Sequence, residues 1–370
     1  MKLMSYITAI GIANPPHKFS QTKIADFMVK AMQLNHNESR LLHTVFKASG
    51  IDFRHSVLAD YGREKDFTFY SNSWDFEPFP TTDKRLSVFR ENVLTLSSHA
   101  VDDMLRSVPS FNIKEVTHLI VVCCTGMYAP GLDIELVKKY NLSPSVHRTG
   151  INFMGCYAAF NALKVADAFC HQDENAKVLV VCTELCSLHF QKKLTDDNLL
   201  AIALFADRSA ALLVESKTKQ RLKLKPESFH TLLVAESNDD MAWTIGDLGF
   251  EMKLSTYVPS IIKSGIAELT EKLLGKISKK LSDIRFLAVH PGGKKILENI
   301  EQELKIPKEK NQAAYYVLQN YGNMSSPTVL FVLHSIFSKI HGEDNEEYIL
   351  SFAFGPGLTL ESMVLKIEMN

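Results

Sequence analysis

Residues 150–169 read GINFMGCYAAFNALKVADAF, and this stretch decides how the rest of the sequence is interpreted. Gly155 precedes Cys156, and the Ala-rich apolar segment that follows is typical of a buried helix. A cysteine at a helix N-terminus meets the positive end of the helix dipole and unpaired backbone N–H groups. Both stabilise a thiolate, so we expect a lowered pKa and a reactive sulfur. An isolated cysteine is more often a buried structural residue, so the surrounding sequence has to decide.

Short apolar runs alternate with longer amphipathic segments on both sides of Cys156. We expect strands at 118–124, 177–182, 210–214, 284–290 and 348–354. We expect helices at 89–105, 156–170, 257–281 and 327–339. Such alternation predicts an α/β protein in which helices cover mostly parallel sheets.

Strand, loop and apolar helix recur in comparable order in the two halves of the chain. The polar stretch TKQRLKLKPES at 218–228 interrupts the apolar pattern between them. We therefore expect two similar halves, residues 1–220 and 221–370, packed as one unit.

The composition excludes several classes of function. The 370 residues carry a formal net charge of -1, with 46% hydrophobic and 22% charged residues. This balance gives no electrostatic case for nucleic acid or an anionic membrane as partner. No run of roughly 18 apolar residues predicts a membrane helix, and the N-terminus lacks the pattern of a signal peptide. All six cysteines lie between 123 and 186, which is not a disulfide framework, so we expect a cytoplasmic protein.

Two further segments hold candidate catalytic residues. His290 ends an apolar strand in FLAVHPGG, and Gly292 and Gly293 form a turn before a helix. Asn323 lies in the polar turn YGNMSS at 321–326, where its alternative role is that of a helix cap.

Taken together, Cys156, HPGG at 290–293, YGNMSS at 321–326 and FAFGPGL at 352–358 resemble the type III polyketide synthases, the chalcone synthase-like family. The resemblance covers nearly the whole chain. It implies a thiolase fold with five α/β/α/β/α layers built from two related halves, and a homodimer. It implies acyl-CoA and malonyl-CoA as substrates, with no separate cofactor and no metal.

The resemblance also implies roles. Cys156 would be the nucleophile, paired as a thiolate with an imidazolium at His290, and Asn323 would donate a second hydrogen bond to the thioester carbonyl. These residue types fit the chemistry. An acyl group moves from CoA to Cys156, malonyl-CoA then loses carbon dioxide, and two donors meet the charge that develops on the thioester oxygen.

Other matched positions concern the cavity. Phe205 and Phe250 would be gatekeepers, and Cys186 and His189 would lie on the cavity wall. Ala129 falls where a larger residue of one subunit can reach its partner's cavity. Its small size predicts a tunnel for a long aliphatic chain. Because CTELCSLHF at 182–190 also resembles microbial alkylresorcinol and alkylpyrone synthases, we expect a fatty acyl-CoA starter.

The mode of ring closure stays open. In stilbene-type relatives a Thr, a Glu and a Ser form a network that favours aldol closure, and the matched positions are Cys124, Glu184 and Ser325. A cysteine is a much poorer donor than a threonine. Pyrone formation by lactonisation therefore competes with resorcinol formation.

The entrance for CoA is expected on residues 37–50. Arg40, His43 and Lys47 share one face of a predicted helix. The opposite face carries Leu41, Leu42, Val45 and Phe46. The resemblance assigns this basic face, with Gly292 and Gly293, to the CoA site. His43 stands where the family has an arginine, which weakens the grip on phosphate at pH 7.

Alternatives remain within and outside the family. A ketoacyl-acyl carrier protein synthase III-like enzyme would condense only once, and a type III synthase could use a small or aromatic starter. A catalytically inactive binding protein would not need all three of Cys156, His290 and Asn323. Zinc at Cys182 and Cys186 with His189 would lack a fourth ligand of suitable spacing.

Overall fold

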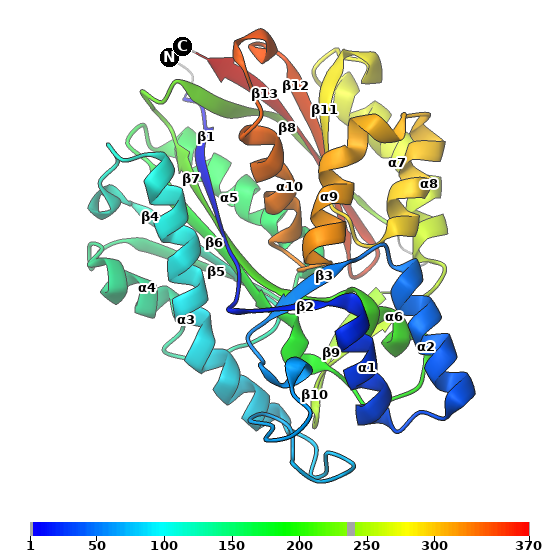
Figure 1. The fold of residues 1–370 in the computed structure, drawn as a ribbon. Coiled ribbons are helices and arrows are strands. Elements are labelled where there is room, and N and C mark those ends of the chain that lie inside the picture. Colours follow the sequence, from blue (N-terminus) through cyan, green and yellow to red (C-terminus); the bar gives the residue numbers. More distant parts are fainter. Residues whose placement is uncertain (1–2, 235–240, 370) are drawn as a thin grey trace.

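The structure is a computed structural model that describes residues 3–234 and 241–369 (Figure 1). A nine-stranded sheet runs through it in the order β11-β12-β13-β8-β1-β7-β6-β4-β5. Its strands are β1 Tyr6–Ala13, β4 His118–Cys123, β5 His147–Asn152, β6 Lys177–Leu185, β7 Asp207–Glu215, β8 Leu222–Leu233, β11 Ile284–Val289, β12 Tyr348–Gly355 and β13 Thr359–Met369. Every residue of β7 is buried, as expected for a strand covered on both faces.

The two halves of the sheet repeat the same pairing. In the first half β1 pairs with β7, β7 with β6, and β6 with β4; in the second, β8 pairs with β13, β13 with β12, and β12 with β11. The first two pairings of each half are antiparallel and the third is parallel. One residue pair between β1 and β8, Ile7 and Leu224, joins the halves. The expectation of mostly parallel sheets is therefore wrong, because β7 and β13 run against both of their neighbours.

Ten α-helices of the described chain cover the sheet and fill the space between its halves. They are α1 Gln21–Met32, α2 His36–Ala48, α3 Thr82–Ser107, α4 Leu132–Tyr140, α5 Ala158–Gln172, α6 Asp196–Leu204, α7 Val258–Gly275, α8 Lys294–Leu304, α9 Gln312–Tyr321 and α10 Thr328–Phe337. Helices α5 and α10 occupy equivalent places, since α5 precedes β6 and α10 precedes β12. Both are rich in buried residues and lie at the centre of the molecule (Figure 1).

Alternate residues of the central strands enter two different cores. Ile120 and Val122 of β4 pack in the core that contains α5 and α10, whereas Leu119 and Val121 pack in the core beneath α3. Side chains on a strand point to opposite faces in turn, so one continuous apolar run supplies both cores.

Most of the predicted elements appear, with shifted ends. The five predicted strands correspond to β4, β6, β7, β11 and β12, and the four predicted helices to α3, α5, α7 and α10. Helix α5 begins at Ala158, not at Cys156, and α7 ends at Gly275. Two small sheets were not predicted: β2 His17–Ser20 with β3 Phe53–Ser56, and the hairpin of β9 Met241–Gly246 with β10 Gly249–Leu254. In the described ranges, none of the helices is long and apolar enough to cross a membrane.

Candidate active site

Cys156 lies in a short 3-10 turn, Gly155–Tyr157, that leads into α5. Its side chain is buried, with 1% exposed. Gly155 has φ +76°, and a Cβ there would lie 2.3 Å from Cδ of Pro356. A Cβ on Gly355 would lie 2.5 Å from the ring of Tyr157. The FGPGL motif therefore closes tightly against the turn that presents Cys156, and the glycines permit that approach.

Asn323 connects Cys156 to the HPGG turn. Its backbone pairs with residues 204–206 through hydrogen bonds of 2.8 and 2.9 Å. Its Oδ1 accepts a hydrogen bond of 2.9 Å from the N–H of Ser325 and lies 3.9 Å from Sγ of Cys156. Its Nδ2 donates to the carbonyl oxygen of Gly292 at 3.3 Å. An amide carries two N–H donors, so one remains for another acceptor.

His290 follows β11 and is held by a hydrogen bond of 2.8 Å from its own N–H to the carbonyl of Phe352. Its ring is buried, and neither ring nitrogen has a hydrogen-bond partner among the described residues. The structure links His290 to Cys156 through the contacts of Asn323, not through a direct hydrogen bond within the described chain. Buried polar atoms without partners are costly, and a bound acyl thioester would supply the missing acceptor.

Burial dominates the titration of both groups. It raises the pKa of the Cys156 thiol to about 12, although hydrogen bonds from Ser325 and Asn323 act in the opposite direction. It lowers the pKa of His290 to about 3. The direction for Cys156 is opposite to the one predicted from its helix terminus. The sequence indicated where a helix starts but not how deeply that start is buried.

A cavity opens beside Cys156 and encloses about 870 Å³ of empty space, part of it continuous with solvent. Phe205 and Phe250 both line it; Phe205 is half-buried and Phe250 is buried. Of the other predicted cavity residues, those on its wall are Cys124, Cys186, His189 and Ser325. Ala129 is exposed and lies outside the lining. In a single chain, Ala129 therefore does not shape the cavity.

The Glu184 carboxylate is buried in a hydrogen-bond network that differs from the predicted one. It accepts hydrogen bonds from the backbone N–H of Cys124 at 2.9 Å, the hydroxyl of Thr125 at 2.8 Å and the hydroxyl of Ser326 at 2.7 Å. Burial raises its pKa. The side chains next to the predicted Cys124 and Ser325 thus make these contacts, because successive side chains point in different directions.

The predicted side chains face the nucleophile turn instead. Sγ of Cys124 accepts a hydrogen bond of 3.1 Å from the N–H of Gly155. The side chain of Ser325 acts on Cys156, where it lowers the thiol pKa. Both residues therefore contact the segment that presents the nucleophile.

His189 is fixed as a neutral ring. Its Nε2 hydrogen-bonds the carbonyl of Thr125 at 2.7 Å, and its Nδ1 accepts the N–H of Phe250 at 3.0 Å. The His189 and Phe250 rings stack with centroids 4.3 Å apart. Burial lowers the pKa of His189 to about 3. Since both nitrogens are occupied, His189 is not arranged as a zinc ligand.

Sequence reasoning missed several cavity residues. Trp243 lines the cavity and donates from Nε1 to the carbonyl of Cys124 at 2.7 Å. Ile24 and Met28 of α1, Arg54 and Gln191 also line it. An alternating stretch with a Gly-Asp-Leu-Gly turn at 246–249 could have predicted the hairpin that carries Trp243. No local pattern marks the others.

The predicted CoA residues lie on α2 and at the start of α8. Arg40 and Lys47 are exposed, and Nε2 of His43 lies 3.5 Å from the carboxylate of Asp26. Leu42 and Phe46 are buried as predicted, but Leu41 is 49% exposed, so the apolar face is narrower than expected.

The end of α2 lies close to the start of α8. The side chain of Lys294 lies next to Gly50, just after α2, and the half-buried Gly292 and Gly293 lead into α8. This contact brings the last turn of α2, which carries Lys47, toward the start of α8.

The site holds a buried thiol at a cavity, an amide beside it and, just before the turn that the amide contacts, an imidazole whose ring nitrogens have no partner in the described chain. These groups fit an acyltransferase that would work through a cysteine thioester. The model for "Chalcone and stilbene synthases, N-terminal domain" matches residues 2–218, and the C-terminal domain model matches residues 227–368. The chain belongs to this family of type III polyketide synthases, which perform decarboxylative condensation of malonyl-CoA with acyl-CoA.

Curated relatives agree over nearly the whole chain. It is 30% identical over 370 residues to the "Alpha-pyrone synthesis polyketide synthase-like Pks18" of Mycobacterium tuberculosis, covering 98% of the chain and 91% of that protein. It is 30% identical to the "Putative chalcone synthase" of Bacillus subtilis, covering 99% of each. It is 31% identical to "Probable polyketide synthase 1" of Dictyostelium discoideum, of which it spans 11%.

Solved structures show the same mixed α/β thiolase-like fold. The C-terminal type III domain of Steely1 from Dictyostelium superposes with a TM-score of 0.90 at 29% identity, covering 98% of this chain and 99% of that one. PKS-I from the brown alga Ectocarpus siliculosus superposes with a TM-score of 0.91 at 28% identity, covering 99% of each.

Proposed function

We propose that this synthase extends a fatty acyl starter on Cys156 and closes the product to an alkylpyrone or alkylresorcinol. The observation that carries the proposal is the placement of Cys156 at a cavity that opens to solvent, with the Asn323 amide 3.9 Å away. The ring nitrogens of His290, just before the turn that Asn323 contacts, have no hydrogen-bond partner among the described residues.

Loading uses Cys156 and His290. The sulfur attacks the carbonyl carbon of the acyl-CoA while His290 accepts the thiol proton. The carbon–sulfur bond to CoA then breaks, and the CoA thiolate takes that proton as it leaves. The acyl group remains on Cys156 as a thioester.

Extension uses His290 and Asn323 as donors. Malonyl-CoA loses carbon dioxide, and the electron pair of the broken bond forms an enolate. The thioester oxygen of this enolate accepts hydrogen bonds from N–H groups of both residues. The enolate carbon attacks the acyl-Cys156 carbonyl, and the Cys156 thiolate leaves. Each preorganised donor is worth about 2.7–4 kcal/mol of transition-state stabilisation by analogy with other oxyanion holes.

The starter class follows from the cavity wall. Apolar side chains from four different segments line it: Ile24, Met28, Phe190, Ile202, Met241 and Met252. Such a wall favours an aliphatic chain over a polar one. Phe205 and Phe250, which line the same cavity, are proposed to flank the path of the CoA arm.

Lactonisation is the ring closure that the contacts favour. The Cys124 thiol is engaged with Gly155 and makes no side-chain hydrogen bond to Glu184. The side chains that donate to Glu184 are those of Thr125 and Ser326, so the network expected for aldol closure is not assembled from the matched side chains. One relative that this chain resembles also carries alpha-pyrone synthesis in its name.

Product profiling tests the proposal. Purified protein would be incubated with acyl-CoAs of increasing length, an aromatic acyl-CoA and 13C-malonyl-CoA, and the products identified by mass spectrometry. We expect alkylpyrones from long-chain starters and none from Cys156→Ala. Acceptance of only acetyl or aromatic starters would refute the fatty acyl proposal, and a product with one added unit would indicate single condensation.

We also propose a homodimer in which residues 1–220 and 221–370 of each copy fold as one unit. In this arrangement the exposed Ala129 of one copy would face the cavity of the other. Analytical ultracentrifugation should give twice the 41.6 kDa chain mass, and urea unfolding should be a single transition. A monomer that retains activity would contradict the dimer.

A further inference from the structure

The hairpin β9–β10 forms one wall of the cavity without belonging to the large sheet. Its strands pair only with each other within the described chain. It carries Trp243 and Phe250 into the lining, together with Met241 and Met252. An isolated two-stranded hairpin is only marginally stable in water. The position of this wall therefore depends on the contacts that hold the hairpin to the rest of the molecule.

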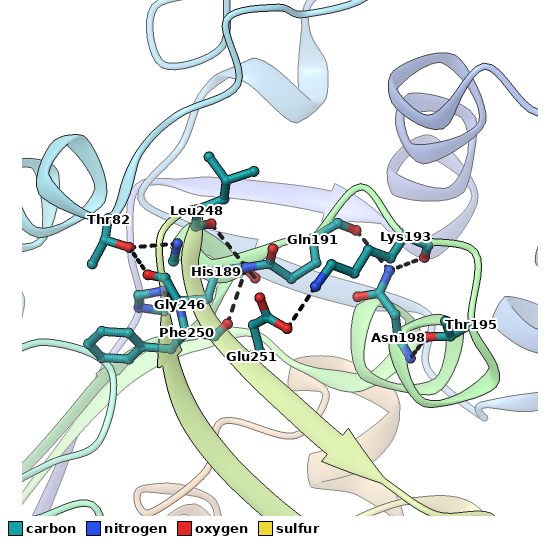
Figure 2. A network of polar contacts seen from close by, with 11 residues as sticks. Thr82, His189, Gln191, Lys193, Thr195, Asn198, Gly246, Leu248, Phe250 and Glu251 are labelled. Carbon is teal, nitrogen blue, oxygen red and sulfur yellow. Dashed lines mark hydrogen bonds and ion pairs between the residues drawn. The ribbon is translucent and has the colours of Figure 1, made fainter.

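Gln191 makes the central contact (Figure 2). Its Nε2 donates to the carbonyl oxygens of Leu248 at 3.0 Å, Phe250 at 3.3 Å and His189 at 3.2 Å. Gln191 is 6% exposed and lines the cavity. A Cβ on Gly249 would lie 3.2 Å from this nitrogen, so the glycine allows the hairpin to come within hydrogen-bonding range. One amide group thus fixes the backbone of the hairpin turn and of the β10 residue that follows it.

Gln191 is itself held in place by α6. The side-chain Nδ2 of Asn198 donates to the carbonyl of Gln191 at 2.8 Å and also to that of Lys193. The backbone N–H of Asn198 is capped by the hydroxyl of Thr195 at 3.3 Å. The amide that holds the hairpin is therefore anchored to a helix end (Figure 2).

Thr82, at the start of α3, fixes the opposite side of the same turn. Its hydroxyl accepts the N–H of Gly249 at 2.8 Å and donates to the carbonyl of Gly246. Its backbone N–H donates to the carbonyl of Asp247 at 2.8 Å. The hairpin turn is thus held between two elements of the first half of the chain.

We propose that Gln191 is a positioning residue that sets the cavity wall formed by Trp243 and Phe250, and thereby determines which starter lengths the enzyme accepts. This inference rests on the proposed function, because it concerns the acyl chain held on Cys156. Gln191 acts through the hairpin and does not touch the reacting atoms. Without its amide, the carbonyls of Leu248 and Phe250 lose a donor and the hairpin shifts, so the space for the acyl chain changes.

The hairpin offers a matched control. Glu251 forms an ion pair with Lys193 at 2.8 Å, with side chains 40% and 52% exposed. Exposed ion pairs contribute little to stability. Glu251→Gln therefore changes a polar contact of the same hairpin without releasing the turn.

The experiment compares Gln191→Leu with Glu251→Gln and the unaltered enzyme. Equimolar short-chain and long-chain acyl-CoAs compete for the enzyme in the presence of malonyl-CoA, and the product ratio gives their relative kcat/KM values. We expect Gln191→Leu to change this ratio by about tenfold or more, the scale on which cavity contacts discriminate chain length. Glu251→Gln should leave the ratio within about twofold, as expected for an exposed pair. Release of carbon dioxide from malonyl-CoA, which uses His290 and Asn323, should persist in both.

Two results would overturn the inference. One is an unchanged ratio in Gln191→Leu with decarboxylation intact. The other is a failure of both Gln191→Leu and Thr82→Val to fold, judged by circular dichroism. The contacts of Gln191 and Thr82 with the hairpin turn would then serve folding and not the choice of starter. If only Gln191→Leu is unfolded, the ratio of short-chain to long-chain products made by Thr82→Val decides whether the hairpin position sets the starter length. Failure of the unaltered enzyme to release carbon dioxide would instead refute the proposed function.

Discussion

At the scale of single residues, the site is governed by desolvation. Cys156 and His290 each lose solvent, and burial alone favours the neutral form of both, with pKa values of about 12 and about 3. Nucleophilic attack requires the thiolate. The attraction between opposite charges in a dry site, and proton acceptance by His290, are the forces available to offset burial.

Desolvation of both groups predicts the effect of His290→Gln on the reactivity of Cys156. Without the imidazole, only burial and the hydrogen bonds with Ser325 and Asn323 act on the Cys156 thiol, so its pKa stays raised. We expect iodoacetamide labelling of Cys156 at pH 7 to slow at least about tenfold. Between pH 6 and 9 the rate should then rise about tenfold per pH unit, as for a thiol titrating well above that range. Peptide mass spectrometry would measure the rates.

His230→Gln provides the control for that variant, because His230 lies on β8 outside the cavity. In His230→Gln, iodoacetamide should label Cys156 at the same rate as in the unaltered protein. A His290→Gln profile that matched the unaltered protein would show that His290 does not control the Cys156 proton.

Glu184 gives a second prediction at this scale. Its Oε1 accepts its hydrogen bond from Ser326, so Ser326→Ala leaves a buried carboxylate oxygen without that donor. We expect a loss of about 1–3 kcal/mol in the free energy of unfolding, measured by urea titration. Ser325→Ala should cost less, since Ser325 faces Cys156. Equal costs would mean that Ser325 also supports Glu184.

At the scale of elements, the turn before α5 decides whether Cys156 is presented correctly. In Gly155→Ala, the new Cβ would have to occupy the position of the Pro356 ring at a positive φ. We expect a loss of stability on the order of 1–3 kcal/mol from strain. Product formation should fall about a hundredfold, because small misplacements of a nucleophile are costly.

Gly275→Ala is the matched control for this change. Gly275 ends α7, and an added Cβ there meets nothing within 4 Å. The free energy of unfolding and the rate of product formation should both stay near those of the unaltered protein. If Gly155→Ala were equally benign, the packing of FGPGL against the nucleophile turn would not position Cys156.

His189 makes the cavity wall sensitive to acid. Its Nδ1 accepts the N–H of Phe250, so a proton on Nδ1 would face another donor. Its folded-state pKa of about 3 lies below the unfolded value of about 6.5, so the unfolded state binds more protons as the pH falls below 6.5. The contribution of His189 is fully present above that pH and is lost progressively down to about pH 3.

Between pH 7 and 5 this linkage corresponds to about 2 kcal/mol. Urea unfolding at the two pH values should show a smaller difference for His189→Asn than for the unaltered protein. An equal pH dependence in both would mean that other groups account for the acid sensitivity.

The elements also show what the sequence could predict. Strands such as β4 and β7 are long apolar runs in a regular alternation, so periodicity alone located them. A local turn pattern at 246–249 favours a hairpin, but the place of β9–β10 at the cavity could not be predicted, because it depends on contacts of Gln191 and Thr82 that are distant in the chain. The ends of α5 and α7 shifted because packing, not propensity, sets where a helix stops.

At the scale of the whole molecule, the site joins residues that no local pattern brings together. Cys156 comes from the first half, His290 and Asn323 from the second, and their meeting depends on how the halves are duplicated and packed. Only the combination of motifs predicted this assembly. The Glu184 partners were misassigned because matched positions give no side-chain direction.

The same two halves meet at the predicted CoA entrance, and this leads to a prediction about charge. Arg40 and Lys47 on α2 are exposed, and Lys294 at the start of α8 lies beside the end of α2. His43 stands between Arg40 and Lys47 on this face, with its Nε2 3.5 Å from the carboxylate of Asp26, whereas an arginine there would always carry a positive charge. His43→Arg should lower KM for acyl-CoA about two- to fivefold, and Lys47→Gln should raise it by a similar factor, as expected for exposed charges.

The effects of both substitutions on KM should become smaller when the salt concentration rises from 50 to 200 mM, because exposed charges are screened. Steady-state kinetics at the two salt concentrations would measure them, with kcat expected to stay constant. Lys339→Gln, on an exposed segment after α10, is the control and should leave KM unchanged. If KM responded equally to Lys47→Gln and Lys339→Gln, the attraction would come from the overall charge of the protein. A response confined to α2 would place the phosphates of CoA where the two halves of the chain meet.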